Sequence, residues 1–341
     1  MKTIVLEQEV LEREIKPQAL LDEYRRLLAR EVQARLVTPN QLTPTACPGC
    51  CSDRGSAAFV KAGLTYVRCG ECTSVYVSPR PSDAVLADFY RNSEAARFWR
   101  DRILRETRGV RREKVFRPRV EWLLGVVDEY RPDIRRAIAV GYHNDLLVEE
   151  IVRQERETFQ IVVTNPLGDL EFAGIRHPRV TVHPSPVTAF ASFGPADLVL
   201  LFDIVDRSAD VEALFAAARD ALVPGGLLLV SATLISGFDL QVLGDRSESI
   251  YPTERLNLFS AEGLTLLFER FGFEALEFST PGTFDVEVVQ RAIQADPARE
   301  WPRFIRYLID HRDEAARSAF QRYLQEFRLS SFARLALRRL P

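Results

Sequence analysis

The segment at residues 135–151, RRAIAVGYHNDLLVEEI, constrains the fold more than any other part of the sequence. An apolar run at 137–140 meets a turn at Gly141, and beyond Asp145 the apolar residues recur at helical spacing. This order of strand, turn and helix is typical of the first unit of a doubly wound α/β domain. There the turn lies at the carboxyl end of the strand, and the amino end of the helix faces a nucleotide-like ligand.

The same alternation continues to the end of the chain and predicts an α/β fold with a largely parallel sheet. Residues 236–260 form a long connection, which predicts a lid or substrate loop. Strands are expected at 159–163, 180–183, 197–202, 227–232, 273–279 and 330–337, and helices at 211–222, 261–271 and, as a pair, between 301 and 327.

Composition limits the protein class. With 341 residues, of which 46% are hydrophobic and 27% charged, the chain can bury an ordinary core and divide into about two domains. No uncharged apolar run approaches the roughly 18 residues of a membrane span, and the acidic start argues against a signal peptide, so we expect a cytoplasmic protein without membrane association. A net charge of −3 argues against nucleic acid as a partner.

Four of the five cysteines form two C-x-x-C pairs, Cys47 with Cys50 and Cys69 with Cys72. Their spacing is typical of a four-cysteine zinc site, and the apolar segment between them predicts a β-hairpin that turns at Ala62-Gly63. Since four protein ligands fill a tetrahedral site, the predicted zinc is structural rather than catalytic.

These patterns divide the chain into an N-terminal helical arm (1–45), a zinc ribbon (46–80), a helical linker or cap region (81–132) and a Rossmann-like domain (133–341) with the insertion 236–260. The arm contains a helix at 18–36, interpreted as a packing element. Between Arg97 and Arg119 ten basic residues face three acidic ones. This excess fits either a solvated, salt-bridged helix face or a phosphate-binding surface.

Several motifs together resemble the zinc-ribbon subgroup of class I S-adenosylmethionine-dependent methyltransferases, many of which are associated with sugar modification in polysaccharide or natural-product pathways. The resemblance implies a seven-stranded sheet whose last strand is antiparallel. The motifs are CPGC with CGEC, VYVSPRPS (75–82), RREKVFRPR (111–119), LVPGGLLLV (222–230), SGFDLQVLG (236–244) and LNLFS (256–260).

The sequence departs from this family pattern at the expected cofactor site. Where family members resemble one another in an acidic residue before a G-x-G-x-G turn, this chain has Ala139, Gly141, His143 and Asp145. The ribose-binding carboxylate is replaced by Asn165. An acidic-histidine pair reads Asp206-Arg207, and a histidine of the substrate loop, a candidate base in the family, reads Arg255. Asn144-Asp145 also suit a helix N-cap, which explains the turn without any ligand.

Two hypotheses follow. In the first, the protein is a non-catalytic methyltransferase-like binding or scaffolding module, with an active relative or pathway enzyme as partner. In the second, it is an active methyltransferase for a sugar or related small molecule: Gly141, Tyr142, Asn165 and Asp203 hold S-adenosylmethionine, and Glu254 or Tyr251 acts as the base. The substitutions favour the first. A nucleotide-linked sugar or another phosphorylated small molecule is the expected ligand, with Arg111 and Arg112 at its phosphates and 236–260 over the sugar.

Overall fold

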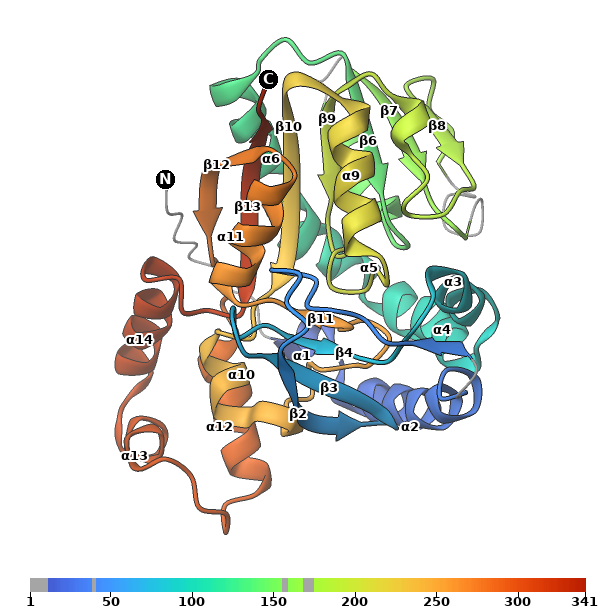
Figure 1. The fold of residues 1–341 in the computed structure, drawn as a ribbon. Helices are drawn as coiled ribbons and strands as arrows, with labels where there is room; N and C mark the ends of the chain where they lie inside the picture. The colour runs from blue at the N-terminus through green and yellow to red at the C-terminus, as the bar shows by residue number, and fades with distance from the viewer. Residues whose placement is uncertain (1–11, 39–40, 155–158, 168–174) are drawn as a thin grey trace.

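A seven-stranded mixed sheet forms the centre of the computed structural model, which describes residues 12–38, 41–154, 159–167 and 175–341 (Figure 1). Its strand order is β12-β13-β10-β9-β6-β7-β8, and β13 is antiparallel to both of its neighbours. The sheet therefore confirms the class I arrangement. The strands are β6 (Arg136–Val140), β7 (Gln160–Thr164), β8 (Val180–His183), β9 (Ala196–Leu201), β10 (Leu222–Thr233), β12 (Phe273–Ser279) and β13 (Phe332–Arg339).

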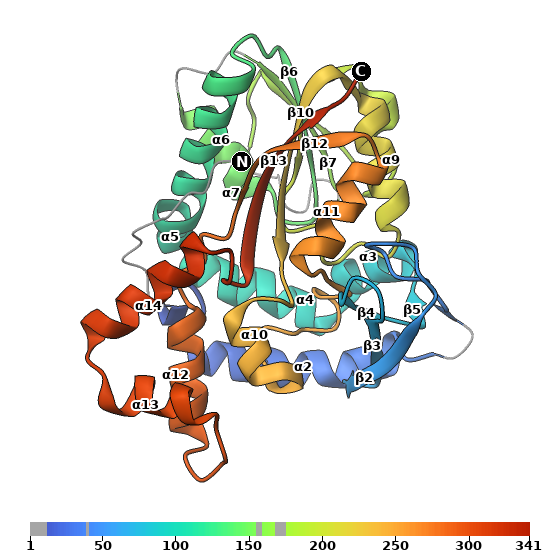
Figure 2. The same cartoon turned by 60° about the vertical axis from the view of Figure 1, so that its left-hand side comes forward.

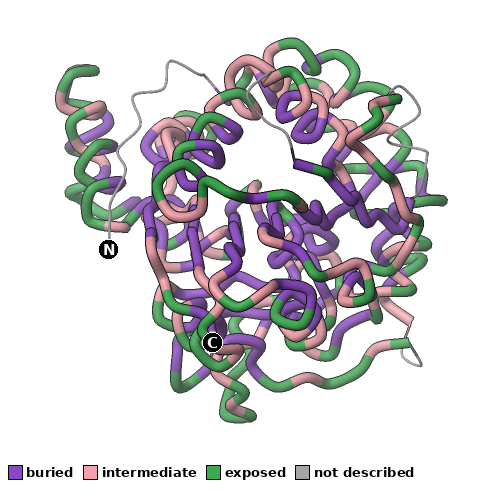
Figure 3. The backbone as a smooth tube through the Cα atoms, turned by 90° about the horizontal axis from the view of Figure 1, so that it is seen from above, coloured by how far each residue is buried: buried purple, intermediate pink, exposed green. Residues whose placement is uncertain are grey.

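Helices cover both faces of this sheet because its strands are apolar on both sides (Figure 2). On one face, α6 (Arg117–Tyr130) and α7 (Asp145–Arg153) pack against Ala137, Leu198 and Leu229. On the other face lie α9 (Val211–Ala221) and α11 (Ala261–Arg270). Seen from above, the buried residues gather in the middle of the molecule, and the exposed residues lie mainly around them (Figure 3).

The cysteine segment forms a second, four-stranded sheet with the order β11-β4-β3-β2. The hairpin of β2 (Gly55–Lys61) and β3 (Leu64–Cys69) turns at Ala62 and Gly63, whose φ angles are both positive, and β4 (Val75–Val77) is its third strand. The fourth strand, β11 (Asn257–Leu258), comes from the far end of the 236–260 connection. The short strands β1 (Leu42–Thr43) and β5 (Arg80–Pro81) pair beside it.

The N-terminal helices and the part of the helical region that precedes α6 lie below the carboxyl ends of the parallel strands (Figures 1 and 2). The arm helix α2 buries Leu21, Tyr24 and Leu28 in the same core as the ribbon residue Tyr66 and the sheet residue Val140. Two π-helical stretches interrupt the helical region, and such stretches are frequent at functional sites. The elements are α1 (Glu12–Ile15), α2 (Gln18–Arg35), α3 (Asp83–Asn92), α4 (Glu94–Phe98), η2 (Trp99–Leu104), α5 (Arg105–Arg111) and η3 (Arg112–Phe116).

The connection at 236–260 is a largely buried segment rather than an open loop. It contains α10 (Phe238–Leu243) and the 3-10 turn η5 (Gly244–Arg246), and Thr253 and Leu256 within it have no exposed surface. After β12, helix α12 (Asp285–Ala295) packs on α10, and α13 (Arg303–His311) and α14 (Glu314–Glu326) follow. Among the described residues, no helix is both long and apolar enough to cross a membrane.

Candidate functional site

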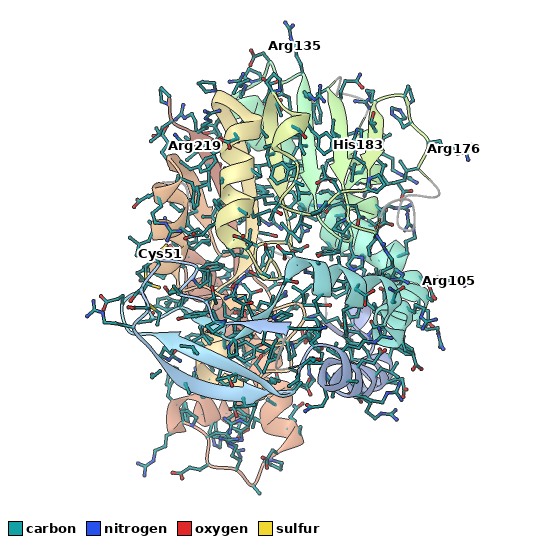
Figure 4. The ribbon with its side chains drawn as sticks, turned by 45° about the vertical axis from the view of Figure 1, so that its right-hand side comes forward. Cys51, Arg105, Arg135, Arg176, His183 and Arg219 are labelled. Atoms are coloured by element: carbon teal, nitrogen blue, oxygen red, sulfur yellow. The ribbon has the colours of Figure 1, made fainter. Side chains whose placement is uncertain are left out.

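A cavity of about 570 Å³ lies where the carboxyl ends of β6 and β9 face the helical region. This is the edge at which open α/β sheets bind ligands. Its walls come from the turn after β6, the helical stretch 99–119, residues 251–255 and the segment 281–285. Figure 4 shows Arg105, which also lines the cavity, on the helical side, and Arg135 at the opposite end of the sheet.

The turn after β6 is filled by side chains of the chain itself. Gly141 has φ +152°, and a Cβ atom placed there would lie 3.0 Å from Nδ2 of Asn144, so this side chain covers the glycine. Asn144 occupies the N-cap position of α7 but forms no capping hydrogen bond. Arg108 binds Asp145 at 2.7 Å and Glu149 at 2.5 Å, so its guanidinium bridges the first turn of the helix.

Asn165 at the end of β7 is fully buried and uses both ends of its amide inside the protein. Its Oδ1 accepts from the backbone N–H of Leu167 at 2.8 Å, and its Nδ2 donates to the carbonyl of Tyr142 at 3.4 Å. The side chain thus joins the loops after β6 and β7 and does not line the cavity. A carboxylate at this position has no N–H group, so it could not donate the hydrogen bond that the carbonyl of Tyr142 accepts from Asn165.

Asp203 follows β9 and reaches the cavity with its side chain 48% exposed. Arg119 donates to one oxygen at 2.6 Å, and the hydroxyl of Ser231 donates to the other at 3.0 Å. Burial alone would raise the pKa of Asp203, but the charges of Arg119, Arg207 and Arg255 lower it well below its usual range. The group is a stable carboxylate, already paired with an arginine.

Tyr142, Tyr251 and Glu254 also line the cavity, so the structure brings together four of the six predicted cofactor and catalytic residues. The carboxylate of Glu254 accepts from the Tyr24 hydroxyl at 3.2 Å and lies 3.8 Å from Arg207. Although burial raises its pKa, the nearby positive charges lower it on balance, which makes Glu254 a weaker base than an ordinary glutamate. Burial raises the pKa of Tyr251, which keeps the phenol protonated.

The arginines of the helical region divide between the two interpretations. Arg112 pairs with Glu113 at the surface, as a salt-bridged face predicts. Arg111 instead enters the cavity, where its Nε donates to the Thr107 hydroxyl at 2.8 Å and Nη2 to the carbonyl of Ile15 at 2.6 Å.

Sequence reasoning missed three further cavity residues: Arg334, Asp239 and Asp285. Burial and the neighbouring Asp285 raise the pKa of Asp239. Asp285 accepts from Gln321 at 2.8 Å, from the Ser330 hydroxyl at 2.6 Å and from the backbone of Ser331. The signal in the sequence for Arg334 was an arginine inside the otherwise apolar run 332–337 of β13.

The four cysteines of the C-x-x-C pairs form the second candidate site. Their sulfur atoms all lie within 4.8 Å of one another, with 3.4 Å between Cys47 and Cys72 and 3.5 Å between Cys50 and Cys69. Tetrahedral zinc with sulfurs at about 2.3 Å requires sulfurs about 3.8 Å apart, so the cluster fits such an ion. The residue after each pair, Cys51 or Thr73, has a left-handed backbone, and the two turns are alike.

The cysteine cluster is packed against the first turn of α11. Ser260, the N-cap of that helix, donates to the carbonyl of Cys72 at 2.5 Å and accepts from Gly263. A Cβ atom on Gly263 would lie 2.1 Å from the Ser74 hydroxyl and 3.0 Å from the Cys72 sulfur. Cys51 lies at the outer edge of the ribbon, where it contacts Glu212 and Arg270 (Figure 4).

The chain was compared with protein families, curated proteins and solved structures. No curated protein matches the chain. Solved structures similar to it include Burkholderia thailandensis 1,6-didemethyltoxoflavin-N1-methyltransferase with bound 1,6-didemethyltoxoflavin and S-adenosylhomocysteine (TM-score 0.46, 12% identity, 84% of this chain and 100% of that chain). Another is the cyclopropane synthase MmaA2 from Mycobacterium tuberculosis (TM-score 0.41, 15% identity, 67% and 85%). The family model described as "Methyltransferase domain" matches residues 83–278, more than half of the sequence, and the chain therefore belongs to this methyltransferase family.

Proposed function

We propose that this protein is a non-catalytic member of the methyltransferase family that binds a small molecule in its cavity. Its setting would be a sugar, polysaccharide or natural-product pathway. The observation that carries the proposal is the turn after β6, where Asn144 covers Gly141 and Asp145 is engaged by Arg108. The glycine surface that would meet S-adenosylmethionine is thereby covered by a side chain of the protein itself.

The magnitude of this loss supports a binding role over methyl transfer. Hydrogen bonds to a charged partner contribute about 1.5–3 kcal/mol each, so losing the ribose carboxylate and crowding the turn cost roughly 3–5 kcal/mol. This corresponds to a factor of about 10²–10⁴ in affinity. Methyl transfer also requires alignment, and a displacement of about 1 Å costs on the order of 10² in rate.

Calorimetric titration of the protein with S-adenosylmethionine and S-adenosylhomocysteine tests the proposal. We expect dissociation constants between about 0.1 and 10 mM, from the roughly 10²–10⁴-fold loss applied to a cofactor that binds at about 1 μM. Micromolar binding of either compound, or a crystal soak with S-adenosylmethionine ordered over Gly141, would overturn it.

The alternative is an active methyltransferase with an altered pocket. It is favoured by the position of Tyr142, Asp203, Tyr251 and Glu254 around one cavity. In that case Glu254 or Tyr251 would receive the acceptor proton, against the pKa directions noted above. Micromolar cofactor binding, together with its loss in Asp203→Ala, would support this alternative.

We assign the cysteine cluster to structural zinc, because four thiolates fill a tetrahedral site and leave no position for a substrate. A partner follows from the binding role: a module without its own chemistry serves an active relative or pathway enzyme. Co-purification of the protein with a catalytically competent methyltransferase, lost when the cavity is mutated, is the corresponding test.

A further inference from the structure

Arg334 is a buried cation on the wall of the cavity. It is 6% exposed and lies within the sheet, opposite Ser231 of β10 and Ser279 of β12. Its guanidinium carbon is 5.6 Å from the ring centre of Trp122 and 5.7 Å from that of Phe332. Within the described part of the chain it has no ion pair and no hydrogen-bond acceptor, and its Nε is buried without a partner.

A second buried arginine lies beside it. Arg119 is also 6% exposed, and its guanidinium carbon is 6.0 Å from the same Phe332 ring. Arg119 forms an ion pair with Asp203. The hydroxyl of Ser231, which lies opposite Arg334 in the sheet, donates a hydrogen bond to the same carboxylate. The charged groups that act on Arg334 are the guanidinium of Arg119 and the carboxylate of Asp203. These three groups together carry a net positive charge.

Arg111 adds a further positive charge to the cavity, because its hydrogen bonds go to a hydroxyl and a carbonyl and not to a carboxylate. Burial, and then the charge of Arg119, lower the pKa of Arg334 to about 9. Asp203 raises it only in part.

A buried charge is costly unless it is paired and hydrogen-bonded. The two aromatic faces attract the guanidinium but offer no acceptor for its N–H groups. A carboxylate or phosphate supplies both a negative charge and oxygens at the spacing of the guanidinium fork. We propose that the cavity binds its ligand through an acidic group, a carboxylate or a phosphate, which pairs with Arg334 and is assisted by Arg119.

This inference rests on the proposed function in that it takes the cavity as the binding site, but it does not depend on whether cofactor binding is lost. The full-length, zinc-loaded protein is titrated with sodium acetate, sodium phosphate and sodium chloride at matched ionic strength, without S-adenosylmethionine. Melting temperature and calorimetric heat are followed. We expect acetate or phosphate to raise the melting temperature above the chloride baseline, and the more effective anion identifies the acidic group.

In Arg334→Gln we expect at least tenfold weaker binding of that anion, with an unliganded melting temperature equal to or above that of the wild type, because an unpaired buried charge is removed. Arg338→Gln is the matched control: it lies on the same strand, pairs with Glu274 at the surface and should bind like the wild type. Should Arg334→Gln fail to fold, Arg334→Lys, which retains the charge without the fork, is expected to bind with intermediate affinity.

Wild-type protein that responds to acetate and phosphate only as it does to chloride would overturn the proposal, as would Arg334→Gln binding the anion with unchanged affinity. A failure of the proposed function is separate. Micromolar S-adenosylmethionine binding would refute the non-catalytic role while leaving the anion site intact, provided that the acetate or phosphate response still depends on Arg334.

Discussion

The cysteine ribbon keeps the residues of the family pattern, whereas the turn after β6 departs from that pattern. In the ribbon, all four ligand positions of the resemblance are kept, and their sulfur atoms converge within 4.8 Å. At the turn, His143 and Asp145 stand where the family pattern has glycines, and Asn165 has become a buried link between two loops. Both segments lie in the same folded unit.

The difference shows which residues each region needs to keep the fold. The ribbon is too small to fold on its own core, so its cysteines are needed for structure whatever the protein does. The turn contributes to the fold mainly through its backbone, and side chains can fill it without loss of the sheet. Under the proposed function, the fold is kept while the cofactor site is lost.

Replacing a ribbon ligand should have the largest effect. In Cys69→Ala we expect loss of the bound zinc and a fall in the free energy of unfolding of more than about 5 kcal/mol, since structural zinc in small domains contributes roughly 10–16 kcal/mol. Elemental analysis and thermal unfolding measure both. Cys51→Ala removes an exposed thiol outside the cluster and should keep the zinc. Purified protein that contains no zinc, and whose four thiols react freely while it is folded, would contradict the assignment.

Rebuilding the turn is the next largest test. The combination of Ala139→Asp, His143→Gly, Asp145→Gly and Asn165→Glu should raise the affinity for S-adenosylmethionine by about 10²–10⁴, equivalent to about 3–5 kcal/mol. Loss of the Asp145 carboxylate also releases Arg108 from the helix start.

The control for this combination is Arg153→Gln, which alters a surface pair with Glu149 at the far end of α7 and should leave cofactor affinity unchanged. Calorimetry compares the two variants. If the rebuilt turn binds no better than the wild type, these four positions do not limit cofactor binding, and the proposal based on the turn is wrong.

A smaller loss of stability is expected at Asn257, which joins the ribbon sheet to the loop after β9. Asn257 is fully buried, accepts from Arg80 at 2.9 Å and donates to the carbonyls of Val205 and Ser208. Asn257→Ala leaves buried groups unpaired, which should cost about 3 kcal/mol in chemical denaturation. Arg54→Ala, which removes a ribbon surface pair with Glu71, should change stability by less than about 0.5 kcal/mol. Equal denaturation midpoints for both variants would show that the joint contributes little.

The smallest change in stability is expected at two glycines, one in a crowded site and one in open space. Gly263→Ala places a methyl group against Ser74 and Cys72 and should destabilise the protein by about 1–2 kcal/mol. Gly109 lies in helix α5 with nothing within 4 Å of its Cβ position, so Gly109→Ala should stabilise by about 0.5–1 kcal/mol. Opposite shifts in melting temperature are expected, and the idea of a closely packed ribbon is wrong if both shifts are positive.

Much of the fold was predictable because it follows local patterns. The strands β8 and β12 begin and end where the apolar runs do, and helix α2 ends one residue short of the expected limit. Helix α12 was missed, and the fourth strand of the ribbon sheet was not anticipated. Strand β11 has two residues and pairs with a segment distant in the sequence, so neither length nor periodicity reveals it.

The candidate site was less predictable because its chemistry depends on pairing. The sequence placed Tyr142, Asp203, Tyr251 and Glu254 among the candidates, and all four line the cavity. It did not reveal that Arg119 pairs with Asp203, or that Asn165 turns its amide into the protein. Such partners come from separate elements, and a single sequence carries no record of their contact.

The pairing of β4 with β11 means that the strands of the ribbon sheet are synthesised at widely separated times. Tyr76 of β4 precedes its register partner Asn257 of β11 by 181 residues (257 minus 76), which at about 5–20 residues per second is roughly 9–36 s of synthesis. During that interval the cysteines and three strands of the ribbon sheet have already left the ribosome, while the strand that completes the sheet has not been made. A metal ion bound at this stage would hold the hairpin and β4 in register as a template. The later segment, with Tyr251 and Glu254 just ahead of β11, would then dock onto a surface that the ion had already ordered.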